Sequence, residues 1–157
     1  MEENILEIVE KSCLIHRDVI AIKYLSHREI VEKSYGDLWD DIRKTAVILQ
    51  NKGLCGTHIA LVGSSSYEWI CAYMAILFMG NTAVPLDANL SAPELHELLN
   101  RSGSTALFCG ASRKDVITEL TDDCPEMNIV FTMEKKVDIE HLEGADSNPQ
   151  LAILSFE

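Results

Sequence analysis

The sequence is poor in basic residues for its length. Its 157 residues include 13 Lys and Arg against 25 Asp and Glu, which gives a formal net charge of −12. A surface this acidic repels phosphate backbones and anionic lipid headgroups. The composition therefore argues against nucleic-acid binding and against docking on anionic membranes.

Long apolar runs and a secretory leader are also missing. The longest apolar stretch, residues 69–79, is shorter than the roughly 18 residues typical of a transmembrane helix, and it favours a buried helix instead. The chain opens Met1-Glu2-Glu3-Asn4, without the basic start and apolar stretch of a signal peptide. We therefore expect a cytoplasmic protein with no membrane span.

The five cysteines lie far apart, and no two of them form a Cys-x-x-Cys pair. This spacing argues against a disulfide framework and a zinc site, and it predicts reduced, mostly buried thiols. The five histidines are equally scattered, and we expect His96 and His141, which have acidic neighbours, to lie at the surface. No metal-binding residue is predicted.

Helical and strand-like patterns alternate along most of the chain. Strands are predicted at 18–25, 29–35, 58–62, 82–86, 105–109, 128–133 and 151–155, helices at 4–11, 36–52, 67–79, 91–101 and 113–122, and a polar loop at 134–150. The first two strands read as an antiparallel hairpin. The later alternation predicts an α/β fold, a mainly parallel sheet with helices on both faces, in one domain spanning residues 1–157.

Capping patterns mark the starts of three predicted helices. The pairs with capping-box spacing are Ser34 with Asp37, Ser65 with Glu68, and Ser91 with Glu94. Gly53 and Gly80 follow the last residues of two helices, where glycine is favoured because it adopts the left-handed conformation without strain.

Two loops after predicted strands could bind a ligand. Residues 63–66, Gly-Ser-Ser-Ser, precede a helix, whose N-terminal N–H groups could hold an anion. This loop is neither a Walker loop nor a dinucleotide fingerprint, and no Lys follows it, so we interpret it as a tight turn with a helix cap. Residues 87–90, Asp-Ala-Asn-Leu, could supply a carboxylate, but we interpret them as a polar turn.

Acidic residues near the end of the chain are also interpreted as ordinary surface. Asp122, Asp123 and Glu126 could suggest a cation site, but they flank Cys124-Pro125 in a predicted helix-to-strand connection, and we interpret them as solvated surface. The acidic residues at 138, 140, 143 and 146 lack the fixed spacing of a calcium loop. No Gly-x-Ser-x-Gly elbow is present, and no cysteine has a histidine partner nearby in sequence. We therefore name no catalytic, cofactor-binding or metal-binding residue.

Five segments of the chain carry a resemblance to a known family. They are Ser-Tyr-Gly-Asp-Leu at 34–38, Cys-Gly-Thr-His-Ile-Ala-Leu at 55–61, Ser-Ser-Tyr-Glu-Trp-Ile at 65–70, Ala-Ile-Leu-Phe-Met-Gly-Asn-Thr-Ala-Val-Pro-Leu-Asp at 75–87 and Glu-Leu-His-Glu-Leu-Leu-Asn-Arg-Ser-Gly at 94–103. In their order and spacing they resemble the AMP-forming acyl-CoA synthetases of the adenylate-forming superfamily. The resemblance extends over roughly residues 17–156.

The resemblance implies an enzyme that uses ATP and Mg²⁺ to convert a carboxylate into an acyl-adenylate, from which CoA displaces AMP. Glu68-Trp69-Ile70 is most similar to the medium- and long-chain acyl-CoA ligases. In that family the apolar strand at residues 151–156 leads into a glycine-rich phosphate loop, whose first Thr would stand at Glu157. We therefore expect an N-terminal subdomain, truncated before the phosphate loop, that is inactive alone and carries no bound cofactor.

If the chain is such an N-terminal subdomain, its expected partner is the remainder of the ligase. An exposed sheet edge at the last strand is expected to promote dimerisation. Two other interpretations stay open, namely a stand-alone, non-catalytic binding or interaction module derived from the same family, and an unrelated Rossmann-like nucleotide binder.

Overall fold

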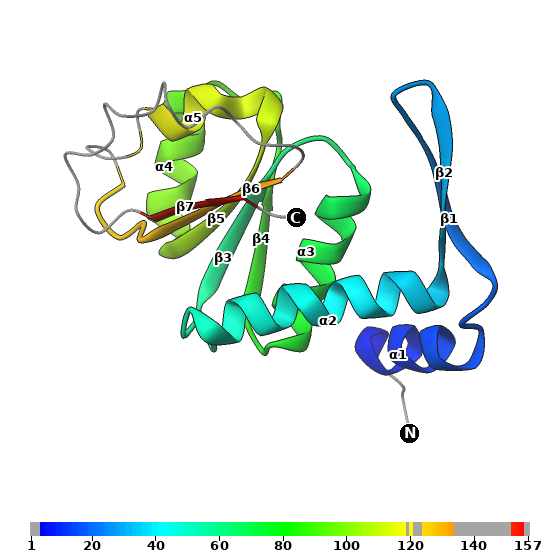
Figure 1. Cartoon of the computed structure of the whole chain (residues 1–157). Helices are drawn as coiled ribbons and strands as arrows, with labels where there is room; N and C mark the ends of the chain where they lie inside the picture. The colour runs from blue at the N-terminus through cyan, green and yellow to red at the C-terminus, as the bar shows by residue number, and fades with distance from the viewer. Residues whose placement is uncertain (1–3, 119, 121–123, 134–151, 156–157) are drawn as a thin grey trace.

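The computed structural model describes residues 4–118, 120, 124–133 and 152–155 (Figure 1). Its helices are α1 (Ile5–Ile15), α2 (Tyr35–Asn51), α3 (Tyr67–Phe78), α4 (Ala92–Ser102) and α5 (Lys114–Thr118), with a 3₁₀ turn η1 (Ala111–Arg113). Its strands are β1 (Ile20–Ser26), β2 (Glu29–Ser34), β3 (His58–Val62), β4 (Thr82–Leu86), β5 (Ser104–Gly110), β6 (Ile129–Met133) and β7 (Ala152–Ser155).

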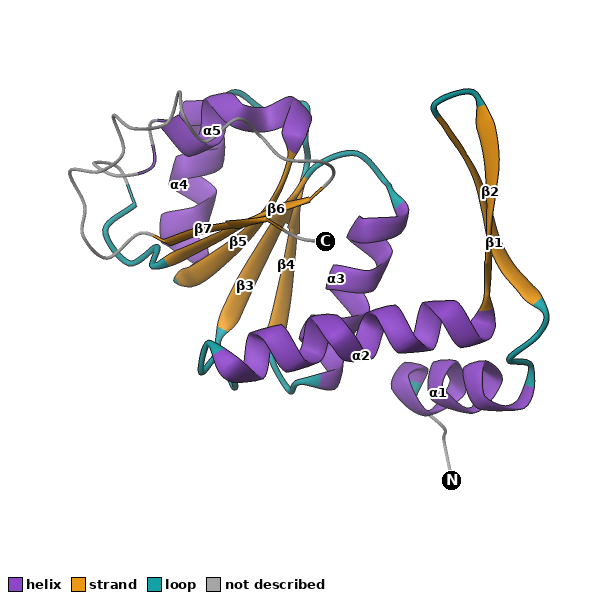
Figure 2. Cartoon of the chain, viewed as in Figure 1, coloured by secondary structure: helices purple, strands orange, loops and turns teal. Residues whose placement is uncertain are grey.

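The five later strands form one parallel sheet in the order β4-β3-β5-β6-β7. Helices cover both of its faces (Figure 2). Strands β1 and β2 pair antiparallel as a separate two-stranded hairpin beside α2. The predicted fold class, a parallel α/β sheet with an N-terminal hairpin, is confirmed.

Alternation along the central strands divides the apolar core into two clusters. Ile59 and Leu61 of β3 pack in the cluster beneath α1, α2 and α3, whereas Ala60 and Val62 pack beneath α4 and α5. All four side chains are fully buried. Successive residues of a strand point to opposite faces, so a strand covered on both sides must be apolar throughout.

The helix starts agree with the capping patterns in two of three cases. Ser34 Oγ accepts a hydrogen bond from the Asp37 N–H (3.1 Å) at the start of α2, and the Glu94 carboxylate accepts from the N–H and hydroxyl of Ser91 (2.9 and 2.7 Å). The Ser65 prediction was wrong, because α3 is capped by Ser66, whose Oγ accepts from the Trp69 N–H (3.1 Å).

The prediction that His96 lies at the surface was also wrong. Its side chain is 2% exposed, and its Nε2 lies 3.0 Å from the Val116 carbonyl oxygen. Residue 96 belongs to the buried stripe of α4, together with Ala92, Leu95 and Leu99. Its acidic neighbour Glu97 points to solvent.

The prediction of mostly buried thiols is confirmed. Cys13, Cys71, Cys109 and Cys124 are buried and Cys55 is exposed, and these five cysteines form no disulfide with one another. In the described part of the chain, no helix combines the length and apolar character needed to cross a membrane. His141, the 134–150 segment and the Asp122–Asp123 pair lie outside the described residues.

Candidate functional site

The sheet has a switch in winding direction at β3. The chain runs from β3 to β4 on one side and then crosses back to β5 on the other, because β3 pairs with both of these strands. Loops leaving the carboxyl ends of neighbouring strands diverge at such a point, and open α/β sheets bind their ligands in the crevice that results. The topology therefore directs attention to the loops after β3, β4 and β5.

A pocket of about 550 Å³ lies at this edge, formed by those three loops and by α3. Its lining consists of Gly63, Ser64, Ser65, Trp69, Leu86, Asp87, Ala88, Asn89, Ser112 and Arg113. Both loops considered from the sequence, 63–66 and 87–90, contribute to it. The contribution of η1 was not foreseen.

Trp69 supplies the aromatic wall of the pocket from the first turn of α3. The Ser66 cap fixes that turn, and the indole stacks on Tyr73 one turn later, with ring centroids 5.3 Å apart and planes 7° apart. Residues four apart lie on one helix face, so this stacking holds the indole orientation.

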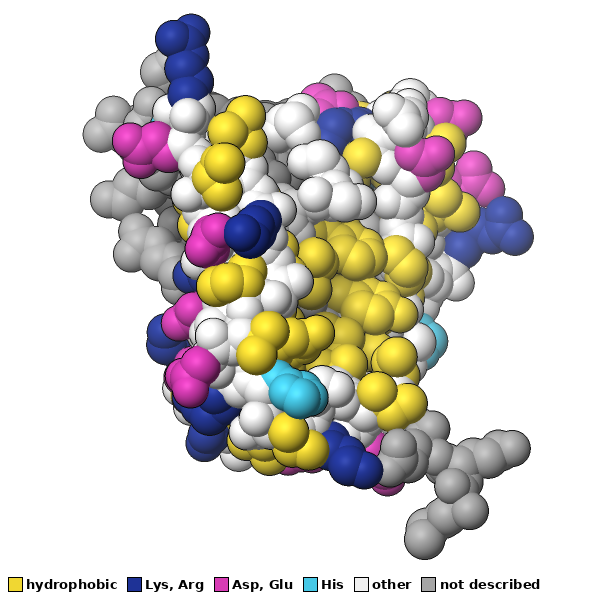
Figure 3. Space-filling model, turned by 90° about the vertical axis from the view of Figure 1, so that its right-hand side faces the viewer, with side chains coloured by type: hydrophobic (Ala, Val, Ile, Leu, Met, Phe, Trp, Pro, Cys, Tyr) yellow, Lys and Arg dark blue, Asp and Glu magenta, His cyan; other side chains and the backbone are white. Residues whose placement is uncertain are grey.

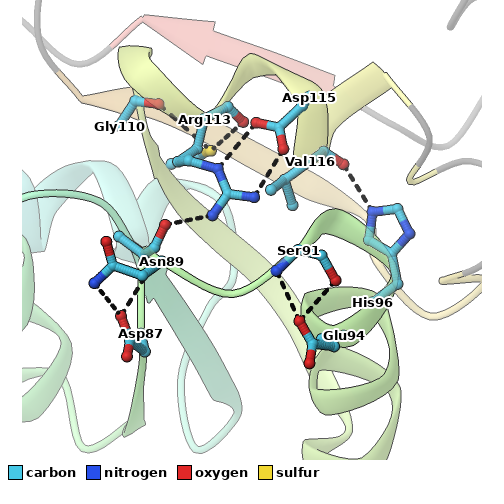
Figure 4. Close-up of polar contacts among 11 residues, drawn as sticks. Asp87, Asn89, Ser91, Glu94, His96, Gly110, Arg113, Asp115 and Val116 are labelled. Atoms are coloured by element: carbon cyan, nitrogen blue, oxygen red, sulfur yellow. Dashed lines mark hydrogen bonds and ion pairs between the residues drawn. The ribbon is translucent and has the colours of Figure 1, made fainter.

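The loop after β4 is a hydrogen-bonded polar turn, as interpreted from the sequence. Asp87 Oδ1 accepts from the Asn89 N–H (2.8 Å) and from Asn89 Nδ2 (2.9 Å), as Figure 4 shows. Side chains that bond their own backbone two residues along are typical of such turns. Here the turn also places both side chains in the pocket lining.

Arg113 joins two walls of the pocket. Its guanidinium donates two hydrogen bonds to the Asp115 carboxylate (3.0 and 2.7 Å) and one to the Ala88 carbonyl oxygen (2.5 Å), and the side chain is 12% exposed (Figure 4). The hydrogen bonds from Arg113 are the main reason that the pKa of Asp115 lies below its usual value. The positive charge of Arg113 is thus already engaged by groups within the protein.

Two glycines bring β3 and β5 into close contact at the floor of the pocket. A Cβ added to Gly63 would lie 3.2 Å from the Gly110 Cα and N atoms, and one added to Gly110 would lie 3.1 Å from the Gly63 Cα. Neither glycine has a positive φ. Close approach of the two backbones, rather than an unusual conformation, is therefore what requires glycine here.

The pocket offers hydrogen-bonding groups and one aromatic surface. Its lining residues include three serines, Asn89 and Asp87, together with Arg113, whose guanidinium is neutralised by Asp115. Among the described residues, no group of three His, Cys, Asp or Glu side chains could hold a metal ion. The arrangement suits a ligand bound by hydrogen bonds and ring contact.

Residues 9–153 match the family model described as AMP-binding enzyme. The chain belongs to this family. The match spans the hairpin, both walls of the pocket and nearly all of the sheet. It confirms the family to which the five sequence segments pointed.

The proteins to which this chain is similar include several ligases. The acyl-CoA ligase cnsG of Penicillium expansum is 26% identical over 106 residues, which cover 67% of this chain and 22% of that protein. The long-chain-fatty-acid–CoA ligase FadD13 of Mycobacterium tuberculosis is 30% identical over 95 residues, covering 60% and 19%. This chain thus spans about a fifth of the length of these curated relatives.

Solved structures of a ligase and of a carboxylic acid reductase share the fold. The coronafacic acid ligase of Pectobacterium brasiliense superposes with a TM-score of 0.78 at 24% identity, over 94% of this chain and 30% of that one. The AMP-bound A-PCP didomain of a carboxylic acid reductase from Segniliparus rugosus gives 0.83 at 16% identity, over 99% and 26%. At these identities the likeness establishes the fold alone.

Proposed function

We propose that this chain is the N-terminal portion of an ATP-dependent, AMP-forming carboxylate–CoA ligase, and forms one domain that precedes the ATP phosphate loop. The observation that carries the proposal is the family match over residues 9–153, because it includes both walls of the pocket at the carboxyl edge of the sheet. Names of relatives, among them two acyl-CoA ligases, support CoA as the thiol acceptor.

Medium- and long-chain fatty acids are the carboxylates that we propose for the whole enzyme. The support is the Glu68-Trp69-Ile70 segment and the similarity to a long-chain-fatty-acid–CoA ligase. Other relatives are named as a carboxylic acid reductase and a cyclosporin synthetase. The assay must therefore distinguish a CoA ligase from these two kinds of enzyme. Reduced, scattered cysteines support a cytoplasmic location.

The described residues do not fit Mg²⁺ and ATP phosphates by themselves. Arg113 is the cation of the pocket lining, and it would have to leave Asp115 and the Ala88 carbonyl to meet a phosphate. Adenylyl transfer depends on preorganised donors and cations around the phosphates. We therefore assign no catalytic step to this chain, and we propose that ATP, Mg²⁺ and CoA act in the longer enzyme.

Carboxylate-dependent exchange of pyrophosphate into ATP tests this proposal. The 157-residue chain should give no exchange with octanoate, palmitate or benzoate. A complete ligase that contains this chain should exchange with octanoate and palmitate and should then form acyl-CoA. Exchange by the chain alone would contradict the proposed division of labour, and a complete enzyme that accepts only benzoate or an amino acid would contradict the fatty-acid class.

A stand-alone binding module is the second candidate, favoured by the polar pocket, which needs no further polypeptide for its described lining. A saturable rise in the melting temperature of the isolated chain with ATP or NAD would support this alternative.

The predicted dimer through the edge of the sheet stays a prediction, because the side chains of β7 lie outside the described set.

A further inference from the structure

The first turn of α3 contacts the pocket on one side and the hairpin on the other. Tyr67 and Trp69 are two residues apart in this turn, and each helical residue is rotated by about 100° from the last, so the two side chains leave the helix in nearly opposite directions. Trp69 lines the pocket, whereas Tyr67 stacks on Tyr24 of β1, with ring centroids 5.7 Å apart and planes 12° apart. One helical turn therefore carries both the aromatic wall of the pocket and a contact with the hairpin.

The Tyr67 ring is held by groups from two further elements. Its hydroxyl donates a hydrogen bond to Asp41 Oδ2 of α2 (2.8 Å), and Lys33 Nζ of β2 lies 4.9 Å from the centre of the ring. Burial raises the pKa of the Tyr67 hydroxyl above its ordinary value, so the hydroxyl keeps the proton that it donates. A hydrogen bond from a buried hydroxyl to a carboxylate is among the stronger kinds, and it fixes the position of the ring.

Asp41 is in turn fixed by its other partners. The same carboxylate accepts hydrogen bonds from Lys33 Nζ (3.2 Å) and from Lys44 Nζ (3.0 Å). Its side chain is 27% exposed, so these contacts are only partly open to competition from water. The carboxylate therefore has few other positions from which it could still meet the Tyr67 hydroxyl.

Apolar packing holds the hairpin less completely than it holds the sheet. The side of the molecule that carries the hairpin shows hydrophobic side chains gathered around a hollow (Figure 3). No residue of β1 is buried, and Leu25 and Ile30 are each 73% exposed. Apolar stabilisation is roughly proportional to the area removed from water. We therefore expect the polar contacts around Tyr67 to matter more at this side of α3 than they would inside the core.

The start of α3 connects this contact to the pocket. Ser66 Oγ accepts a hydrogen bond from the Trp69 N–H (3.1 Å), and the helix begins at Tyr67. The first N–H groups of a helix have no partner within the helix, so its first turn depends on side chains that hold it. The cap, the anchored ring and the pocket wall thus share a single turn, and a displacement of Tyr67 would be transmitted to Trp69 through its backbone.

We propose that Asp41 and Tyr67 are positioning residues for the pocket, because through the first turn of α3 they set the orientation of the Trp69 indole. The hairpin takes part through Tyr24 and Lys33, although it contributes no residue to the pocket lining that the structure describes. The proposal concerns the shape of the pocket, and it holds whichever ligand the pocket binds and whichever reaction the longer protein performs.

Fluorine NMR of the 157-residue chain labelled with 5-fluorotryptophan tests the proposal without any ligand. The chain has two tryptophans, and Trp69→Phe assigns their two resonances. Asp41→Ala removes the acceptor of the Tyr67 hydroxyl, and Tyr67→Phe removes the donor but keeps the ring. Asp40→Ala is the matched control, because this carboxylate lies one residue away in α2, is 49% exposed and pairs with Arg17 instead.

Asp41→Ala and Tyr67→Phe should move the Trp69 resonance in the same direction. The double variant should move it no further than the larger of the two, because both changes remove the same hydrogen bond. Asp41→Asn keeps an oxygen that can accept from the hydroxyl, and it should return the resonance close to its original position. A loss of overall stability populates the unfolded chain but does not move the resonance of the folded one, so the shift separates positioning from support of the fold.

Three outcomes would overturn the proposal. One is a Trp69 resonance that stays in place in both Asp41→Ala and Tyr67→Phe, while far-ultraviolet circular dichroism shows that the variants are folded. Another is a shift of equal size in Asp40→Ala, because the effect would then not depend on the hydroxyl of Tyr67. The third is a shift in Asp41→Ala that Tyr67→Phe does not reproduce, which would mean that Asp41 does not act through Tyr67.

Discussion

The parallel sheet and the N-terminal hairpin differ in how completely their strands are covered. Six of the seven residues of β5 are buried, and β5 lies between β3 and β6 with helices on both faces. Along β1 no residue is buried, and exposed and half-buried positions alternate only from Ile22 onwards. The sheet therefore has a core of its own, whereas the hairpin depends on contacts along one face. This difference separates the part of the chain that holds the pocket from a part that is buried on one face only.

The largest expected effect belongs to the centre of the sheet. Phe108 of β5 is fully buried and stacks on Phe131 of β6, with ring centroids 4.6 Å apart. Phe108→Ala should lower the free energy of unfolding by about 3–5 kcal/mol, because it removes a buried ring and leaves a cavity. Urea unfolding followed by circular dichroism measures the change. Phe108→Leu is the matched control and should cost clearly less, because it leaves a smaller cavity. Equal losses would mean that the size of the cavity is unimportant here and that the lost ring contact accounts for the cost.

A second, smaller effect is expected where β3 and β5 meet beneath the pocket. Gly63→Ala would place a methyl group 3.2 Å from the Gly110 backbone, which cannot move aside as a flexible side chain could. We expect a loss of roughly 1–3 kcal/mol, typical of overpacking. The exposed Ser65→Ala in the same loop is the control and should change little. An unchanged midpoint for Gly63→Ala in urea unfolding would show that the two strands can separate without cost.

The fold was largely predictable because its signals are local. Strands β3 and β4 were predicted with the bounds that the structure has, since each is an apolar run between turn residues. The errors also have local causes. Any of three successive serines could cap α3, and the one that does so is Ser66, which directly precedes the first helical residue. His96 was judged by its acidic neighbour, although its helical spacing from Ala92 and Leu99 places it in the buried stripe of α4.

The pocket was only partly predictable because its assembly is not local. The sequence identified the loops at 63–66 and 87–90 separately, but no pattern indicates that they share a cavity. Their proximity follows from the strand order β4-β3-β5, which also brings Arg113 against the loop after β4. A reader of the sequence could have found Arg113 only by first committing to that strand order and then examining the residues after β5.

The stability of the contact between the hairpin and the helices α2 and α3 should depend on pH. Asp41 of α2 accepts hydrogen bonds from Tyr67 of α3 (2.8 Å), from Lys33 of β2 (3.2 Å) and from Lys44 (3.0 Å). Burial raises the pKa of the Asp41 carboxyl, but these hydrogen bonds outweigh burial and hold the pKa below its usual value. A carboxyl whose pKa is lowered by folding stabilises the folded state above its unfolded pKa of about 3.9 and loses that contribution as the pH falls through the lower folded value.

Asp41→Asn should therefore cost about 1–2 kcal/mol at pH 6, because two ammonium groups lose their charged acceptor. The difference from the unmodified chain should shrink as the pH falls below about 4, where Asp41 of the unfolded chain takes up a proton, and it should be lost below the lower pKa of the folded state. Asp40→Asn, whose partner Arg17 is half exposed, is the control. Faster hydrogen exchange confined to β1 and β2 would locate the loss at the junction. A difference that does not shrink at all between pH 6 and pH 3 would contradict the role given to the charge.

The smallest change in stability is expected on the exposed face of the β1–β2 hairpin, where Leu25 pairs with Ile30. Leu25 is 73% exposed, so Leu25→Thr in the isolated chain should change the free energy of unfolding by no more than about 0.5 kcal/mol, as is usual at exposed positions. Thr also favours the extended conformation, which removes a loss of strand propensity as a competing cause. Val31→Thr, at a half-buried position of β2 facing the covered side, is the matched control and should cost more.

A loss above about 1.5 kcal/mol for Leu25→Thr would mean that the side chain is already buried in solution. Repeating the urea titration at a tenfold lower protein concentration would then decide between burial by a second copy, which dilution weakens, and burial within the chain, which it does not.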